Sequence, residues 1–259
     1  MRMMKKVLCT VTVLALSVSL LAGCGSTAAS PVSSAASTAA ESTTSSVVSE
    51  TTSAAADENE AAAAQLLNDL TGSYQELWPV ILADEYKQTW LDDCTALVGE
   101  DNAEAAFEKL SSMVTGDVYG EDAVKAYANG GGAYFCGFTN SLATLTFDGE
   151  TSTISGTDKD GNVLFSHTYH YIGMEPVHGL YEFESDDADS GEFTYFFLAP
   201  DTSAETYHIE FRYGSDAEAL SQYDAGEYAY WVASGISTDC DQTMIDNCIE
   251  LFCTENLAG

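Results

Sequence analysis

The sequence predicts an α+β domain in which a helical N-terminal segment precedes an antiparallel β-barrel. Helical patterns dominate residues 59–128, and short runs of aromatic and β-branched residues separated by turns fill residues 133–214. Successive β-hairpins of this kind form an up-and-down antiparallel sheet. Closing such a sheet into a barrel removes its unpaired edges, so a barrel is the expected architecture.

The helices are predicted from stretches rich in Ala and Leu with helical periodicity. They are expected at residues 59–70, 85–98, 103–114 and 122–128, and the run Gly130–Gly132 ends the helical part. A further helix is expected near the C-terminus, where apolar residues fall near one helical face. These residues are Met244, Ile245, Cys248, Ile249 and Phe252.

The strands are predicted from the residue types that favour extended backbone. They are expected at residues 133–138, 141–147, 152–157, 163–172 and 180–184, followed by a hairpin of residues 193–200 and 206–214. The polar segment 201–205 joins the two arms of this hairpin. Alternation in the second arm places His208, Glu210 and Arg212 on one face, and Ile209, Phe211 and Tyr213 on the other.

His208 and Glu210 form the candidate metal site. Side chains two residues apart on one face of a strand are about 7 Å apart along the chain, close enough to converge on one ion. The alternative is that Arg212 forms a salt bridge with Glu210 and that His208 is simply hydrogen-bonded on the barrel wall. A carboxylate bonded to a guanidinium is a poorer metal ligand.

The N-terminus has the features of a lipoprotein signal over residues 1–23. A positively charged start is followed by apolar residues 7–21, and the segment ends in Leu21-Ala-Gly-Cys24, which resembles the lipobox of bacterial lipoproteins. The resemblance implies that Cys24 is lipidated and anchors the protein to the cell membrane on its extracytoplasmic face. The alternative is an ordinary secretion signal in which Cys24 has no role.

The rest of the chain divides into a tether and one domain. Residues 24–56 are almost entirely Ser, Thr, Ala and Val, so they are expected to form a disordered tether. Residues 57–259 contain abundant Tyr, Phe and Leu and are long enough for a single sizeable domain, which is expected to be monomeric.

The composition is strongly acidic, with 41 Asp and Glu against 8 Lys and Arg and a formal net charge of −33. Such a chain does not bind nucleic acid or anionic lipid headgroups through electrostatics, but it attracts cations. Most of these carboxylates are expected to be solubilising surface groups.

Five cysteines fall in the predicted domain, and the odd number leaves at least one thiol unpaired or paired between chains. They are Cys94, Cys136, Cys240, Cys248 and Cys253. The chain has no Cys-x-x-Cys, so neither a zinc knuckle nor a thioredoxin-type pair is indicated. Buried thiols, or one disulfide from Cys94 or Cys136 to the C-terminal stretch, are expected.

Five motifs in order resemble those of the ZinT (YodA) family, a lipocalin-like bacterial zinc-recruitment domain that is also fused to AdcA-type lipoproteins. The motifs are Leu70-Thr-Gly-Ser-Tyr-Gln-Glu-Leu-Trp-Pro79, Gly179-Leu-Tyr-Glu-Phe-Glu184, Leu198-Ala-Pro200, His208-Ile-Glu-Phe-Arg-Tyr-Gly214 and Glu227-Tyr-Ala-Tyr-Trp231. The resemblance implies a lipocalin-like antiparallel β-barrel.

The resemblance also implies a zinc site, which the family builds from three histidines. The corresponding positions here are Phe196, His208 and Glu210, so one ligand is lost and another becomes a carboxylate. His167, His170 and His178 are candidates for a replacement ligand. Alternation within residues 163–172 places His167 and His170 on opposite faces, so at most one of them points inward.

The function implied by the resemblance is zinc capture outside the cell, with metal ABC transporter components as partners and no catalysis. The sequence has no Gly-x-Ser-x-Gly elbow, no Gly-rich phosphate loop and no His-Glu-x-x-His motif. The alternative is a metal-independent binding module whose barrel mouth takes a small apolar or glycan ligand. Its expected lining is Tyr171, Tyr195, Phe196, Tyr207 and Tyr213.

Overall fold

The computed structural model describes residues 47–258, with side chains from residue 58 onward. The predicted signal, Cys24 and most of the predicted tether lie outside the described residues. The chain divides into two units, Met1–Glu50 and Thr51–Gly259, and the fold described below belongs to the second unit apart from the first four residues of α1. Within the described part, no helix is both long and apolar enough to cross a membrane.

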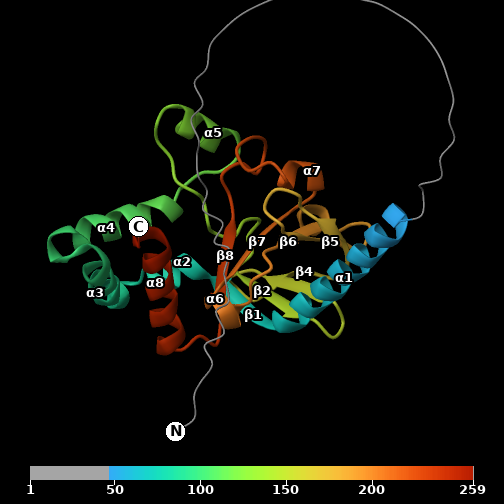
Figure 1. Cartoon of the computed structure of the whole chain (residues 1–259), viewed down its shortest axis with the longest axis horizontal. Coiled ribbons are helices and arrows are strands. Elements are labelled where there is room, and N and C mark those ends of the chain that lie inside the picture. The colour runs from blue at the N-terminus through green and yellow to red at the C-terminus, as the bar shows by residue number, and fades with distance from the viewer. Residues whose placement is uncertain (1–46, 259) are drawn as a thin grey trace, which may run out of the picture. The chain divides into compact units, whose positions relative to one another are not determined.

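The fold is a closed eight-stranded antiparallel barrel, which confirms the predicted α+β architecture with a helical segment before the sheet (Figure 1). The strands follow one another around the barrel in chain order. They are β1 (Gly72–Glu76), β2 (Thr144–Asp148), β3 (Thr153–Thr157), β4 (Val163–Met174), β5 (Tyr181–Ser185), β6 (Tyr195–Leu198), β7 (Ile209–Gly214) and β8 (Ala233–Ser237).

Helices come before, between and after the strands. The α-helices are α1 (Val47–Asp69), α2 (Leu77–Ile81), α3 (Lys87–Val98), α4 (Glu100–Val114), α5 (Glu121–Ala128), α6 (Ser203–Thr206), α7 (Ala217–Leu220) and α8 (Gln242–Leu257). Two 3₁₀ turns, Asp84–Tyr86 and Gly191–Phe193, complete the set of described elements. α1 begins ten residues before the predicted domain boundary and so includes the last part of the predicted tether.

Two hydrophobic clusters hold the fold together. The first fills the barrel and includes the inward side of α1 through Leu66, Leu67 and Leu70. The second, here called the helical cluster, lies where α2, α3, α4 and α8 meet, and these helices lie together beside the barrel in Figure 1. Trp90 anchors it, fully buried, with its indole N–H donating to the Ile81 carbonyl at 2.7 Å.

The barrel closes through two strands that the sequence pattern did not indicate. β1 pairs with β2 on one side and with β8 on the other, where Tyr74 lies opposite Ser237. Both strands are short, and β8 consists mainly of Ala, Ser and Gly, which have low β-propensity.

The strand predicted at residues 133–138 is wrong, because this segment makes only isolated bridges from Phe135 to Thr115 and Trp231. The segment makes only scattered backbone hydrogen bonds, such as the one from Phe135 N–H to the Tyr230 carbonyl at 2.9 Å, and side chains add further ones. The backbone N–H of Phe138 donates to the Glu76 carboxylate at 2.5 Å, and that of Thr139 donates to the Tyr213 hydroxyl at 2.6 Å.

Candidate functional site

β7 carries the candidate site on the outside of the barrel. Ile209, Phe211 and Tyr213 belong to the barrel core, which confirms the predicted alternation along this strand. His208, which directly precedes β7, and Glu210 therefore face away from the barrel interior. They lie on the side where Cys248 of α8 approaches, with its Sγ 3.9 Å from His208 Nδ1.

The His208 imidazole is held in one orientation by the backbone. Nδ1 lies 2.8 Å from the Thr206 carbonyl oxygen, and a carbonyl can only accept, so Nδ1 carries the proton. When the ring is neutral, the lone pair of Nε2 is therefore free, and Nε2 lies 3.8 Å from Oε1 of Glu210. The His208 side chain is 18% exposed and that of Glu210 is 51% exposed, so solvent reaches both groups.

The two groups influence each other's protonation. Burial lowers the pKa of His208, but contacts with Cys248 and Glu210 outweigh burial and hold the pKa well above its ordinary value. Burial raises the pKa of Glu210, but the neighbouring His208 lowers it by more, so the net pKa is below its ordinary value. At any pH at which the His208 ring is charged, a metal ion must therefore displace the proton from Nε2 before it can bind there.

Two more carboxylates lie near this pair. Partial burial raises the pKa of Asp201, with the charges of Glu205 and Glu210 adding to the rise and His208 opposing it. Partial burial likewise raises the pKa of Glu255, which His208 also opposes. Asp201 follows β6 and Glu255 lies on α8, so three elements bring acidic side chains toward one imidazole.

The donor set suits a weak cation site. A nitrogen lone pair and a solvent-exposed carboxylate are suitable zinc ligands, but a tight site needs three or four protein ligands. Among residues 58–258, no three His, Cys, Asp or Glu side chains are arranged to hold a metal ion. His208 and Glu210 are thus the only predicted ligands that the structure brings together.

The correspondence that adds Phe196 to His208 and Glu210 is wrong in its geometry. Phe196 lies opposite Tyr213 in the pairing of β6 with β7, and directly opposed residues share a face of the sheet. Its fully buried ring packs inside the barrel, 5.4 Å from the Tyr213 ring. A histidine at position 196 would therefore point away from His208.

The salt bridge expected between Arg212 and Glu210 is absent from the described residues, because Arg212 is fully buried and bonds to the backbone instead. Its guanidinium donates to the carbonyls of Leu220, Tyr228 and Gln222, and it lies 4.1 Å from the centre of the Tyr223 ring. Glu210 thus stays available as a ligand.

The other three histidines each have their own carboxylate partner. Nδ1 of His167 lies 2.7 Å from Asp187, Nδ1 of His170 lies 2.8 Å from Asp186, and Nδ1 of His178 lies 3.3 Å from Glu175. The side chain of His167 is 16% exposed and that of His170 is 52% exposed, as expected for opposite faces of β4. None of these three histidines is placed to act as a third metal ligand beside His208 and Glu210.

The predicted aromatic mouth of the barrel does not form one lining. Phe196 and Tyr213 are fully buried, and Tyr207 packs against the helical cluster outside the barrel. Neighbouring rings fill the interior: Phe193 stacks on Phe165 at 4.0 Å and lies 5.6 Å from Tyr213. This packing argues against a ligand held inside the barrel at this end.

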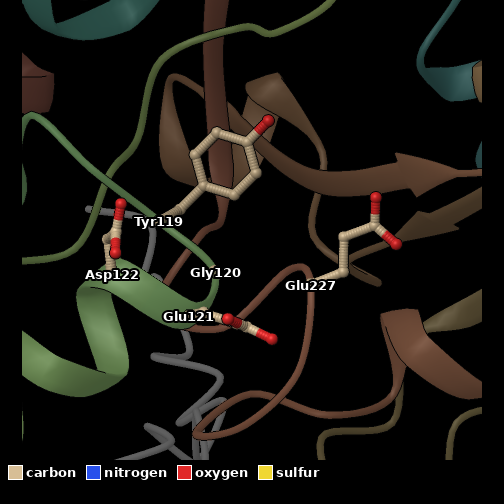
Figure 2. Close-up of a pocket in the computed structure, with 5 residues that line it drawn as sticks. All are labelled: Tyr119, Gly120, Glu121, Asp122 and Glu227. Carbon is tan, nitrogen blue, oxygen red and sulfur yellow. The ribbon is translucent and has the colours of Figure 1, made fainter.

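A surface hollow of about 400 Å³ lies at the start of α5 (Figure 2). Glu121 and Asp122 begin the helix, Tyr119 precedes it, and Glu227 lies on the facing loop. Gly120 allows the close approach, because a Cβ there would come within 2.5 Å of the Glu227 carbonyl. The hollow lacks any histidine and shares no residue with the His208 pair.

The sequence pattern did not reveal Cys248, Asp201 or Glu255 as neighbours of His208. Cys248 and Glu255 are seven residues apart and so share a face of α8, but nothing in the local pattern shows which strand that face meets. Asp201 is part of the polar segment that was expected to be a simple loop. Instead, that segment leads into α6, and the carbonyl of its last residue, Thr206, accepts the hydrogen bond from Nδ1 of His208.

Comparison with known proteins gives structural matches only. No family model matches the chain, and no curated protein matches it. The Zn(II)-bound ZinT-like domain of Streptococcus pneumoniae AdcA is similar with a TM-score of 0.45 and 16% identity, over 71% of this chain and 89% of that chain. Zn(II)-bound AdcA from Streptococcus pneumoniae is similar with a TM-score of 0.42 and 15% identity, over 70% of this chain and 34% of that chain. With TM-scores below 0.5, neither match bears on the site of this chain.

Proposed function

We propose that this protein binds a divalent cation, zinc, weakly and reversibly through His208 Nε2 and the Glu210 carboxylate. One observation carries the proposal: the Thr206 carbonyl accepts a hydrogen bond from Nδ1–H of His208, so that in the neutral ring the lone pair on Nε2 is free beside Glu210. Metal-binding histidines almost always donate their other ring N–H in this way, because the bond fixes both the tautomer and the ring orientation.

The surroundings support a capture role for this site. Asp201 and Glu255 add negative charge near the pair, and the formal net charge of −33 concentrates cations at the surface. With only two protein ligands, water completes the coordination, so exchange is fast. His208 and Glu210 would hold and release the ion without a chemical step.

A third ligand introduced at the correct position is expected to tighten the site. Ala199 donates its backbone N–H to the Glu210 carbonyl at 3.0 Å, one residue beyond the Leu198–Phe211 pair, so it lies opposite Glu210 on the outer face. Ala199→His should raise zinc affinity by about 10–100-fold, by analogy with the losses caused by removing supporting groups. Titration against a chromogenic zinc chelator measures the change.

The matched control for Ala199→His is Phe196→His, which places the same imidazole on the inner face of β6. Phe196→His is expected to lower stability without raising zinc affinity. A larger gain from Phe196→His than from Ala199→His would show that the barrel interior, and not the outer face of β7, holds the metal.

We also propose that the protein is anchored to the cell membrane through lipid on Cys24, with the domain on the extracytoplasmic face. The support is the charged start, the apolar segment 7–21 and the Leu-Ala-Gly-Cys ending. Cys24→Ala should move the protein from the membrane fraction to the soluble fraction, as measured by fractionation and immunoblotting. Retention of the variant on membranes after a high-salt wash would contradict the anchor.

A further inference from the structure

All five cysteines of the described domain lie in or against the helical cluster. Two of them face each other: Cys94 on α3 and Cys253 on α8 are both fully buried, and their Sγ atoms are 3.9 Å apart. The two helices pack closely along their length. Thiols held this near need only side-chain rotations and a small approach of the helices to reach the length of about 2.05 Å of an S–S bond.

We propose that Cys94 and Cys253 form an intramolecular disulfide that ties α3 to α8. The two thiols lose two protons and two electrons as their S–S bond forms. A disulfide oxidant, such as glutathione disulfide, takes up the electrons as its own S–S bond breaks into two thiols. The chain segment between the two cysteines contains seven of the eight barrel strands, because α3 precedes β2 and α8 follows β8.

The arrangement selects this pair over the other combinations. The Sγ of Cys136 contacts the Tyr134 carbonyl, and that of Cys248 faces His208. Among residues 58–258, the only hydrogen-bond contact between two cysteine sulfurs is the one between Cys94 and Cys253. The structure thereby decides between Cys94 and Cys136 as the partner of the C-terminal helix.

The surroundings make this a structural bond. Burial raises the pKa of both thiols, and the neighbouring Asp93 carboxylate also raises the pKa of Cys94 and Cys253. The thiolate is the reactive form in exchange, so a fully buried pair of this kind exchanges slowly once the chain is folded. The extracytoplasmic location proposed above is also the environment in which disulfides persist.

The pairing is tested on the full chain after refolding with glutathione disulfide and, in parallel, with dithiothreitol. Each sample is unfolded in an alkylating agent, digested and analysed by mass spectrometry. We expect a cross-linked peptide joining Cys94 to Cys253 in the oxidised sample, with Cys136, Cys240 and Cys248 alkylated. Cross-links between other cysteines, or alkylation of all five, would overturn the proposal.

The second measurement is the melting temperature of the same two samples. Oxidised protein is expected to melt roughly 5–15 °C above reduced protein, because the bond closes a long loop of the unfolded chain. Cys253→Ala should remove this redox-dependent shift, whereas Cys136→Ala, another buried thiol of the helical cluster, should keep it. Equal melting temperatures of oxidised and reduced parent protein would contradict a stabilising bond, even if Cys253→Ala fails to fold.

Discussion

His208→Ala is expected to weaken zinc binding by about 100-fold or more. Removing a group that merely orients a ligand costs about 10–100-fold in metal affinity, and here the ligand itself is lost. His208 also provides the only nitrogen of the proposed site, which leaves Glu210 as a single carboxylate. Isothermal titration calorimetry of the parent and the variant measures the change directly.

The matched control for His208→Ala is His170→Ala. His170 also lies among carboxylates, with Nδ1 2.8 Å from Asp186 and Nε2 4.0 Å from Glu184, so it tests whether any histidine in an acidic environment suffices. His170→Ala should leave zinc affinity unchanged. Glu210→Gln should weaken binding as well, because it removes the charge of the second ligand while keeping its shape. A loss in His170→Ala combined with normal binding in His208→Ala would place the metal on β4.

Arg212→Ala is expected to destabilise the fold by about 3–5 kcal/mol, because it combines a large-to-small change in a buried position with the loss of hydrogen bonds to buried carbonyls. Arg212 is fully buried, and its guanidinium satisfies the carbonyls of Leu220, Tyr228 and Gln222 while it packs on the Tyr223 ring. The truncation leaves these acceptors without their donor and opens a cavity beneath the segment that follows β7. Chemical denaturation measures the change in the free energy of unfolding.

Lys125→Ala provides the control for Arg212→Ala. Lys125 forms a surface ion pair with Asp122, in which the side chains are 66% and 74% exposed, so its loss should leave the free energy of unfolding nearly unchanged. If Arg212→Ala costs no more than Lys125→Ala, the buried network does not hold the segment onto β7.

The strands in the middle of the chain order of the barrel could be predicted because their own residue types favour extended backbone. The strand around Phe165 and the hairpin of β6 and β7 combine aromatic and β-branched residues with clear turns, so their existence and alternation followed from residue types. β1 and β8 lack that signal. They form strands because closing the barrel supplies hydrogen-bonding partners on both sides, which is a property of the assembled sheet.

The candidate site could be predicted only in part for a similar reason. Alternation correctly placed His208 and Glu210 on one face, because the side-chain period of a strand is a local property. Whether that face lines the interior depends on how the sheet closes. The apolar side chains of Ile209, Phe211 and Tyr213, which alternate with the site residues, occupy the interior. The positions of Cys248 and Glu255 near His208 depend on how α8 packs, and the residue pattern around β7 does not predict that packing.

Nitrogen-15 NMR of the four imidazole side chains, recorded before and after addition of zinc, tests the central claim most directly. The chain has four histidines, and all of them lie within the described residues. The account predicts that zinc shifts the Nε2 resonance of His208 strongly while Nδ1 of the same ring keeps its proton, and that His167, His170 and His178 do not respond. A response at His170 or His167 with none at His208, or no response at any imidazole, would contradict it.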